Sequence, residues 1–194
     1  VSGPLNSPVS AQWRLHGDTA IIEMAQASGL TLAGGLEDND PIAASTIGTG
    51  QLIAMAIERG ARNIIVGAGG SATTDGGLGA LEALYPLERL REVSITVACD
   101  VATRFIEAAE TFGPQKGASP SQVRFLKRRL ERVGQIYLEE RGVDVLQMEM
   151  AGAAGGLAGG LASVGASLVN GFNAVSEEVE LLDLIENVDL VITG

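Results

Sequence analysis

The stretch from residue 67 to residue 77 combines glycines with small hydroxyl side chains and one carboxylate. Glycines let the backbone approach a ligand closely, and the free N–H groups of such a loop and of the helix start behind it favour phosphate or carboxylate. Hydroxyl side chains can add hydrogen bonds to an anionic oxygen. The stretch therefore predicts an anion site. Its candidate substrate- or phosphate-binding residues are Gly69, Gly70, Ser71, Thr73 and Thr74.

Asp75 lies near the end of this stretch, and two interpretations of it are open. Its carboxylate can accept a proton from a hydroxyl group or help to hold a magnesium ion, which makes it a candidate catalytic residue. The alternative is a tight glycine-rich turn that Asp75 caps. The local residues alone do not separate the two.

Three further positions are candidates. Lys116 lies in a Gly- and Pro-rich turn, residues 112–118, where a compact cation can neutralise phosphate or carboxylate charge; a surface turn with an incidental lysine is the alternative. Asp100 ends an apolar run, so its carboxylate would project from the carboxyl edge of a sheet. Gly155 belongs to the string 152–160, which is either a second backbone-lined anion site or a closely packed helix.

Short apolar runs rich in Val and Ile precede several of these candidates and are typical of buried strands. Segments with apolar residues at helical spacing lie between them. Alternating strands and helices predict the α/β class, here one three-layer-like domain with a mostly parallel or mixed sheet. The predicted strands are residues 20–24, 63–67, 93–99 and 190–192, and the predicted helices are residues 50–59, 120–141 and two that begin near 78 and at 176.

The helix at residues 120–141 is the most clearly marked, because Ser119 is suited to the N-cap and Gln122 completes a capping box. Its predicted buried face consists of Val123, Leu126, Leu130, Val133 and Tyr137. For the last helix, Ser176 is the predicted N-cap. Its predicted buried side consists of Leu181, Leu182, Leu184 and Ile185.

Composition excludes several classes of function. The 194 residues are 46% hydrophobic, which suits one sizeable core, and 13 Lys and Arg against 24 Asp and Glu give a net charge of -11 that repels nucleic acid and anionic membranes. One Cys and one His predict neither a disulfide framework nor a metal centre, and we expect a cytoplasmic protein. No apolar run approaches the roughly 20 residues that cross a bilayer, so no membrane partner is expected.

Two nucleotide-binding motifs compete for the same loop. A Walker-type loop needs a lysine that the stretch lacks. Gly67, Gly69 and Ala72 satisfy the relaxed dinucleotide pattern, although Asp100, the acid it requires, lies 33 positions beyond Gly67 and rather too far. A dinucleotide-binding oxidoreductase domain is therefore one alternative function, and a non-catalytic ligand-binding domain is another.

Several strings together resemble the bacterial glycerate kinase family, of the glycerate 2-kinase type, in content and order. They are residues 69–77, 98–101, 112–118, 152–156 and 189–194. The likeness covers nearly the whole chain, and Gly-Pro-Gln-Lys-Gly-Ala is its most specific string. Two departures are notable: Thr74 stands where many members have Asn, and residues 102–105 replace an Asn-Pro-Leu run, which weakens any carry-over to Asp100.

The resemblance implies ATP-dependent phosphorylation of a D-glycerate hydroxyl with Mg²⁺, giving phosphoglycerate, mostly the 2-phosphate in bacterial members, in organic acid metabolism. It further implies that residues 1–194 are the inserted α/β domain of a two-domain kinase, inactive without the flanking domain that both chain ends form. Under this hypothesis Asp75 orients or deprotonates the attacking hydroxyl, and Lys116 offsets charge on the transferring group. Glycerate and ATP are the expected partners, and a homodimer is also considered.

Overall fold

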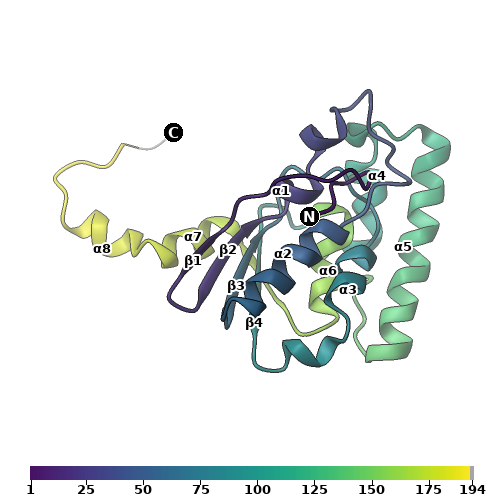
Figure 1. Cartoon of the computed structure of the whole chain (residues 1–194). Coiled ribbons are helices and arrows are strands. Elements are labelled where there is room, and N and C mark those ends of the chain that lie inside the picture. Colours follow the sequence, from purple (N-terminus) through teal and green to yellow (C-terminus); the bar gives the residue numbers. More distant parts are fainter. Residues whose placement is uncertain (193–194) are drawn as a thin grey trace.

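The computed structural model describes residues 1–192. Its strands form one mixed sheet in the order β1-β2-β3-β4-β5 (Figure 1). β1 pairs with β2 antiparallel, whereas the remaining neighbours are parallel. The predicted α/β class with a mostly parallel sheet is confirmed. The strands are β1 (Arg14–His16), β2 (Thr19–Glu23), β3 (Asn63–Gly67), β4 (Ser94–Cys99) and β5 (Ser167–Asn170).

The main core lies on one face of this sheet, because alternate residues of the strands point into it. Ile22, Val66 and Val97 are fully buried there, whereas Ile21 on the opposite face is exposed. The helices of the crossovers between parallel strands cover the core face (Figure 1). They include α2 (Ile47–Glu58), α3 (Leu78–Leu84) and α6 (Leu157–Ala162).

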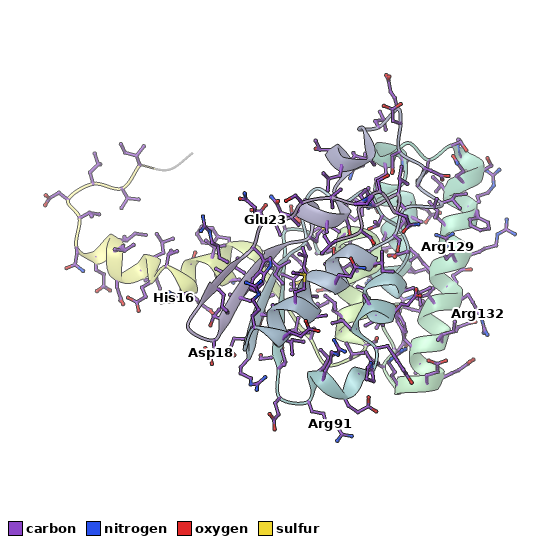
Figure 2. The ribbon with its side chains drawn as sticks, in the orientation of Figure 1. His16, Asp18, Glu23, Arg91, Arg129 and Arg132 are labelled. Atoms are coloured by element: carbon purple, nitrogen blue, oxygen red, sulfur yellow. The ribbon has the colours of Figure 1, made fainter. Side chains whose placement is uncertain are left out.

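α5 (Pro120–Arg141) lies outside these helices and has the predicted bounds. The predicted capping box is present, with the Gln122 N–H donating to Ser119 Oγ at 3.4 Å and the Ser119 N–H donating to Gln122 Oε1 at 2.9 Å. Four of its predicted core residues are buried and Val123 is half-buried. Figure 2 shows Arg132 on the outer side of α5, away from the sheet.

Short helices connect the longer elements, and two of them carry candidate site residues. η4 (Pro114–Lys116) precedes α5, and η5 (Ala153–Gly156) runs into α6. The others are α1 (Ala25–Ser28), η1 (Leu30–Ala33), η2 (Leu87–Leu90), η3 (Phe105–Glu107) and α4 (Ala108–Phe112). In Figure 1, α1 and α4 lie at the end of the molecule where the parallel strands finish.

The second face of the sheet carries α7 (Gly171–Glu178), which contacts β4 and β5 and completes the three-layer-like arrangement. The predicted helix start at Ser176 is wrong, since Ser176 lies inside α7. Asn170 caps this helix instead, its side chain accepting from the Asn173 N–H at 3.3 Å. The reason is local: Asn170 ends β5, and its amide oxygen reaches the first turn of α7.

Two predictions at the C-terminal end are also wrong. α8 (Leu181–Glu186) has no buried residue, and Leu182 is 75% exposed, because α8 lies beyond α7, away from the sheet (Figure 1). Residues 190–192 form no strand and are exposed, since no strand in the described part of the chain lies beside them to pair with their backbone. Thr193 and Gly194, which belong to the same predicted motif, lie outside the described residues.

Candidate functional site

A pocket of about 360 Å³ lies at the carboxyl ends of β3 and β4, the edge at which open α/β sheets bind ligands. Figure 2 labels Glu23, which ends β2 at this edge of the sheet, and Asp18, at the opposite edge. The pocket unites several predicted residues from distant parts of the chain. They are Gly69, Gly70, Ser71, Asp100 and Lys116. Apolar side chains of Leu30, Val101 and Phe112 complete much of the wall.

The loop after β3 presents backbone donors to this pocket. Residues 28–30 hold this loop through two hydrogen bonds. The Leu30 N–H donates to the Gly70 carbonyl oxygen at 2.9 Å, and the Ala72 N–H donates to the Ser28 carbonyl oxygen at 2.9 Å. Within residues 1–192, the N–H groups of Gly69, Gly70 and Ser71 have no acceptor. Gly70 has φ +71°, which favours glycine. The predicted anion cradle therefore has three unused backbone donors.

Lys116 adds a buried cation to these donors. The residue is only 3% exposed, and its Nζ donates to the Thr73 carbonyl oxygen at 2.6 Å and lies 5.9 Å from the centre of the Phe112 ring. Burial lowers the pKa of Lys116 to about 7, although the charge of Asp75 acts in the opposite direction. In the described part of the chain Lys116 has no ion-pair partner. The alternative of an incidental surface lysine is wrong.

The hydroxyls of Thr73 and Thr74 lie behind the pocket wall, because both residues are fully buried and neither lines the pocket. Thr73 Oγ1 donates to the Ala154 carbonyl oxygen at 3.4 Å, and Thr74 Oγ1 has no partner within the described residues. Thr73 contributes to the site through its carbonyl group, which fixes the amine of Lys116. The predicted direct contact of these hydroxyls with a ligand is not supported by this placement.

The carboxylate of Asp75 is occupied by hydrogen bonds and does not line the pocket. Thr46 donates to Oδ2 through both its N–H and its hydroxyl at 2.8 Å. The N–H of Gly77 donates to Oδ1 at 3.0 Å, and that of Gly79 donates to Oδ2 at 3.3 Å. This geometry matches the alternative of a capped turn. It also corrects the predicted cradle, because Asp75 already occupies N–H groups at the start of α3 that were expected to meet the anion.

Gly155 packs against the loop and does not line the pocket. It has φ +66°, and a Cβ there would collide with the carbonyl oxygen of Thr73; its own oxygen accepts from the Gly76 N–H at 3.1 Å. The packing interpretation of the string 152–160 therefore agrees with the structure. Its neighbour Ala154 does line the pocket and has φ +52°, which is uncommon for a residue with a side chain.

Sequence reasoning missed three residues that build the site. Gln115 lines the pocket, and its only signal was its place beside Lys116 in the family string. Thr46 anchors Asp75 from 29 positions away, and no local pattern indicates such a contact. Asn39 joins two loops of the site and could have been noticed as the neutral member of the run Glu-Asp-Asn-Asp.

Other features contribute little to a site. A hollow of about 460 Å³ beside β1 is lined by Trp13, Arg14 and Arg59 among others, but every lining residue is exposed or half-buried. Burial, followed by the charge of Asp100, raises the pKa of Cys99 to about 12, which disfavours the reactive thiolate. Among residues 1–192 no helix is long and apolar enough to span a membrane.

Fold and pocket together define an α/β protein with a candidate ligand pocket at the carboxyl edge of its sheet. The glycerate kinase family model matches residues 1–85 and 86–194, and the chain belongs to this family. The chain is 39% identical to the glycerate 2-kinase of Escherichia coli K12 and also 39% identical to a glycerate kinase of Halalkalibacterium halodurans. Each alignment covers the whole chain and 60% of the relative.

Structural comparison agrees with the family assignment. The crystal structure of a presumed glycerate kinase 2 from Salmonella typhimurium LT2 matches the whole chain with a TM-score of 0.91 at 36% identity. The chain covers 61% of that protein, and therefore spans about three fifths of the length of these relatives.

Proposed function

We propose that the chain is the inserted α/β domain of a two-domain kinase that transfers a phosphoryl group from ATP to a hydroxyl of D-glycerate. One observation carries this proposal: residues 69–71, whose N–H groups have no acceptor within residues 1–192, line one small pocket together with the buried Lys116. Such a pocket is suited to an anion of carboxylate or phosphate size. The names of the family relatives indicate glycerate as the substrate.

In this proposal the loop after β3 binds the carboxylate of glycerate. The N–H groups of Gly69, Gly70 and Ser71, with the Ser71 hydroxyl, donate to its oxygens. Lys116 offsets negative charge on the bound substrate and on the group in transfer. Asp100 lies exposed on the same pocket wall, where its carboxylate can accept a hydrogen bond from a substrate hydroxyl.

The role of Asp75 is the part of the original hypothesis that the geometry favours least. Its four hydrogen bonds hold the loop between β3 and α3, so we assign it to positioning that loop. Deprotonation of the attacking hydroxyl by Asp75 stays a prediction. A group that does so must reach the substrate, and Asp75 is 7% exposed and outside the pocket lining.

ATP and Mg²⁺ fit this chain only in part. The free N–H groups and Lys116 suit one anionic group, such as a single phosphate. Within residues 1–192, however, no cluster of three or more His, Cys, Asp and Glu side chains could hold a metal ion. We therefore assign the binding of ATP with Mg²⁺ mainly to the flanking domain, and the isolated chain is expected to be inactive.

The remaining details of the proposal follow the relatives and the composition. The name glycerate 2-kinase of the Escherichia coli relative favours 2-phosphoglycerate as the product, in organic acid metabolism. An acidic chain with one buried Cys suits a cytoplasmic protein. A homodimer stays a prediction.

The dinucleotide-binding alternative is disfavoured by the same loop. In that class the pyrophosphate binds at the helix N-terminus directly after the first strand. Here residues 68–77 separate β3 from α3, and the carboxylate of Asp75 occupies N–H groups of Gly77 and Gly79 at the helix start. A negative charge at that point would repel a pyrophosphate.

The test is phosphoryl transfer from magnesium ATP to D-glycerate by the complete protein, with residues 1–194 alone assayed in parallel. We expect activity in the complete protein only, and loss of at least about 100-fold in kcat/KM in its Lys116→Met variant. A Lys127→Met variant is the matched control, because Lys127 is a surface residue bound to Glu110 at 3.0 Å. A folded complete protein without activity on glycerate would refute the proposal. Tight nicotinamide binding would instead favour the oxidoreductase.

A further inference from the structure

Asn39 is the buried member of an acidic surface run. The loop between η1 and α2 contains Glu37, Asp38, Asn39 and Asp40. Asn39 is 9% exposed, whereas its three neighbours are exposed. A polar side chain that is buried in a loop needs partners for its donors, so the contacts of this amide are informative.

The side-chain amide of Asn39 joins the two loops that form the anion site. Its Nδ2 donates to the Ala72 carbonyl oxygen at 3.1 Å and to the Lys116 carbonyl oxygen at 2.8 Å, so both N–H bonds are used. The Nζ of Lys116 donates to the carbonyl oxygen of Thr73 in the Gly-rich loop. These three bonds close a ring that links the Gly-rich loop to both ends of the lysine residue.

The loop that carries Asn39 is itself held against the site from two sides. A Cβ at Gly117 would collide with the carbonyl oxygen of Leu36, so the loop approaches the lysine turn closely. From α5, Arg129 Nη1 donates to the Ile42 carbonyl oxygen at 2.9 Å; Figure 2 labels Arg129 on that helix. The amide of Asn39 therefore belongs to an ordered support and not to a free surface loop.

We propose that Asn39 is a positioning residue, which fixes the backbone of Lys116 relative to the unused N–H groups of Gly69, Gly70 and Ser71. The chemistry requires an amide there. An aspartate, like its neighbours, would place only acceptors against two carbonyl oxygens and would repel both. The inference rests on the proposed function for the identity of the ligand, but the support of Lys116 can be measured without any ligand.

Lys116 reports on this support, because the loop that carries Asn39 contacts the carbonyl oxygen of Lys116 and the next residue, Gly117. If the loop loosens, water reaches the amine and the pKa of Lys116 rises from about 7 toward its ordinary value of 10.5. The acidic groups near the amine are Asp75, whose charge acts on it, and Asp100, which lines the same pocket. An Asn39→Ala substitution leaves both carboxylates in place.

The experiment measures the pH dependence of acetic anhydride labelling of Lys116 in the purified protein, resolved by peptide mass spectrometry. Lys127, which is half-buried and paired with Glu110, is the internal reference in the same sample. We expect the Lys116 midpoint of the wild-type protein near 7, and a rise of about one pH unit or more in Asn39→Ala. Asn39→Ser, which keeps one donor, should give a smaller rise. Asp38→Asn, a neighbouring exposed position, should give none.

A kinetic arm separates this inference from the proposed function. In the complete protein, Asn39→Ala should lower kcat with D-glycerate by at least about tenfold. Unchanged Lys116 midpoints in folded Asn39→Ala and Asn39→Ser proteins would overturn the inference. A Lys116 labelling midpoint near 10.5 in the wild-type protein would also overturn the inference, and this measurement remains possible if Asn39→Ala does not fold. A shifted midpoint in a protein without glycerate kinase activity would leave Asn39 as a positioning residue and refute the proposed function alone.

Discussion

The amine of Lys116 donates to the carbonyl oxygen of Thr73 at 2.6 Å, and within the described residues this is its one hydrogen-bond acceptor. A buried ammonium group has three donors, so two are not used by the described residues. Burial makes the charged form costly, and an anion in the pocket would offset that cost. Protonation of Lys116 and binding of an anion are therefore linked.

The first prediction concerns the pH dependence of substrate affinity. An anion binds the protonated amine, and the pKa of Lys116 is about 7 in the free site. Affinity for D-glycerate should be nearly constant below that pKa and should fall above it by up to about tenfold per pH unit. Calorimetric titration of the complete protein from about pH 6 to about pH 9 measures this. In Lys116→Met the affinity should be low and independent of pH; an unaltered profile would contradict the assignment.

The second prediction concerns stability. Because the pKa of Lys116 falls from 10.5 to about 7 on folding, the unfolded chain binds more protons between these values. This group therefore adds stability as pH rises through that window, at up to about 1.4 kcal/mol per pH unit. The difference in unfolding free energy between wild type and Lys116→Met, measured in urea at several pH values, should show this slope. Lys127→Met should not, and equal slopes in both variants would count against a buried amine.

The third prediction concerns Asp75. Asp75→Asn replaces one acceptor oxygen by an NH₂ group that must face the donors of Thr46 or of the α3 start. We expect a loss of about 3 kcal/mol in unfolding free energy. Asp100→Asn, at an exposed carboxylate, should change stability by less than about 0.5 kcal/mol. If Asp75→Asn instead keeps full stability and loses activity, the catalytic hypothesis gains over the positioning role.

The fourth prediction compares two glycines with similar backbone conformations. Gly155 has φ +66° and no room for a Cβ beside the Thr73 carbonyl group, whereas Gly142 has φ +72° and open space. Gly142→Ala should cost about 1 kcal/mol for its backbone conformation alone. Gly155→Ala should cost at least about 3 kcal/mol, because the loop that supports Lys116 must shift as well. Similar unfolding free energies for the two variants would show that the close contact is unimportant.

How far the sequence predicts the fold depends on how local the determining contacts are. α5 was predicted with its bounds, because the capping box of Ser119 and Gln122 and the apolar spacing lie within the helix itself. The central strands were predicted because each is an apolar run between turn residues. Residues 181–185 were predicted as helical, but their predicted burial is wrong, because the burial of Leu182 depends on whether another surface covers it, and an apolar pattern alone cannot supply that information.

The candidate site shows the same limit. The Gly-rich loop and Lys116 stand out by composition, and the structure places them together. The functions of Asp75 and Asn39 depend instead on partners far along the chain, such as Thr46 and the Lys116 carbonyl group. A glycine- and proline-rich turn also suggests an exposed lysine. Lys116 is buried instead, and the loop that carries Leu36 and Asn39 lies against its turn.

The hydrogen bonds around Thr73 also have a consequence for folding. The bond from Asn39 to Ala72 spans 33 positions, that from Lys116 to Thr73 spans 43, and that from Thr73 to Ala154 spans 81. Such contacts require large loops of chain to close, so we expect them to form late in folding. The pocket is therefore complete only when strands and crossovers from most of the chain have assembled. Ligand affinity is then expected to report on whether the whole chain has folded.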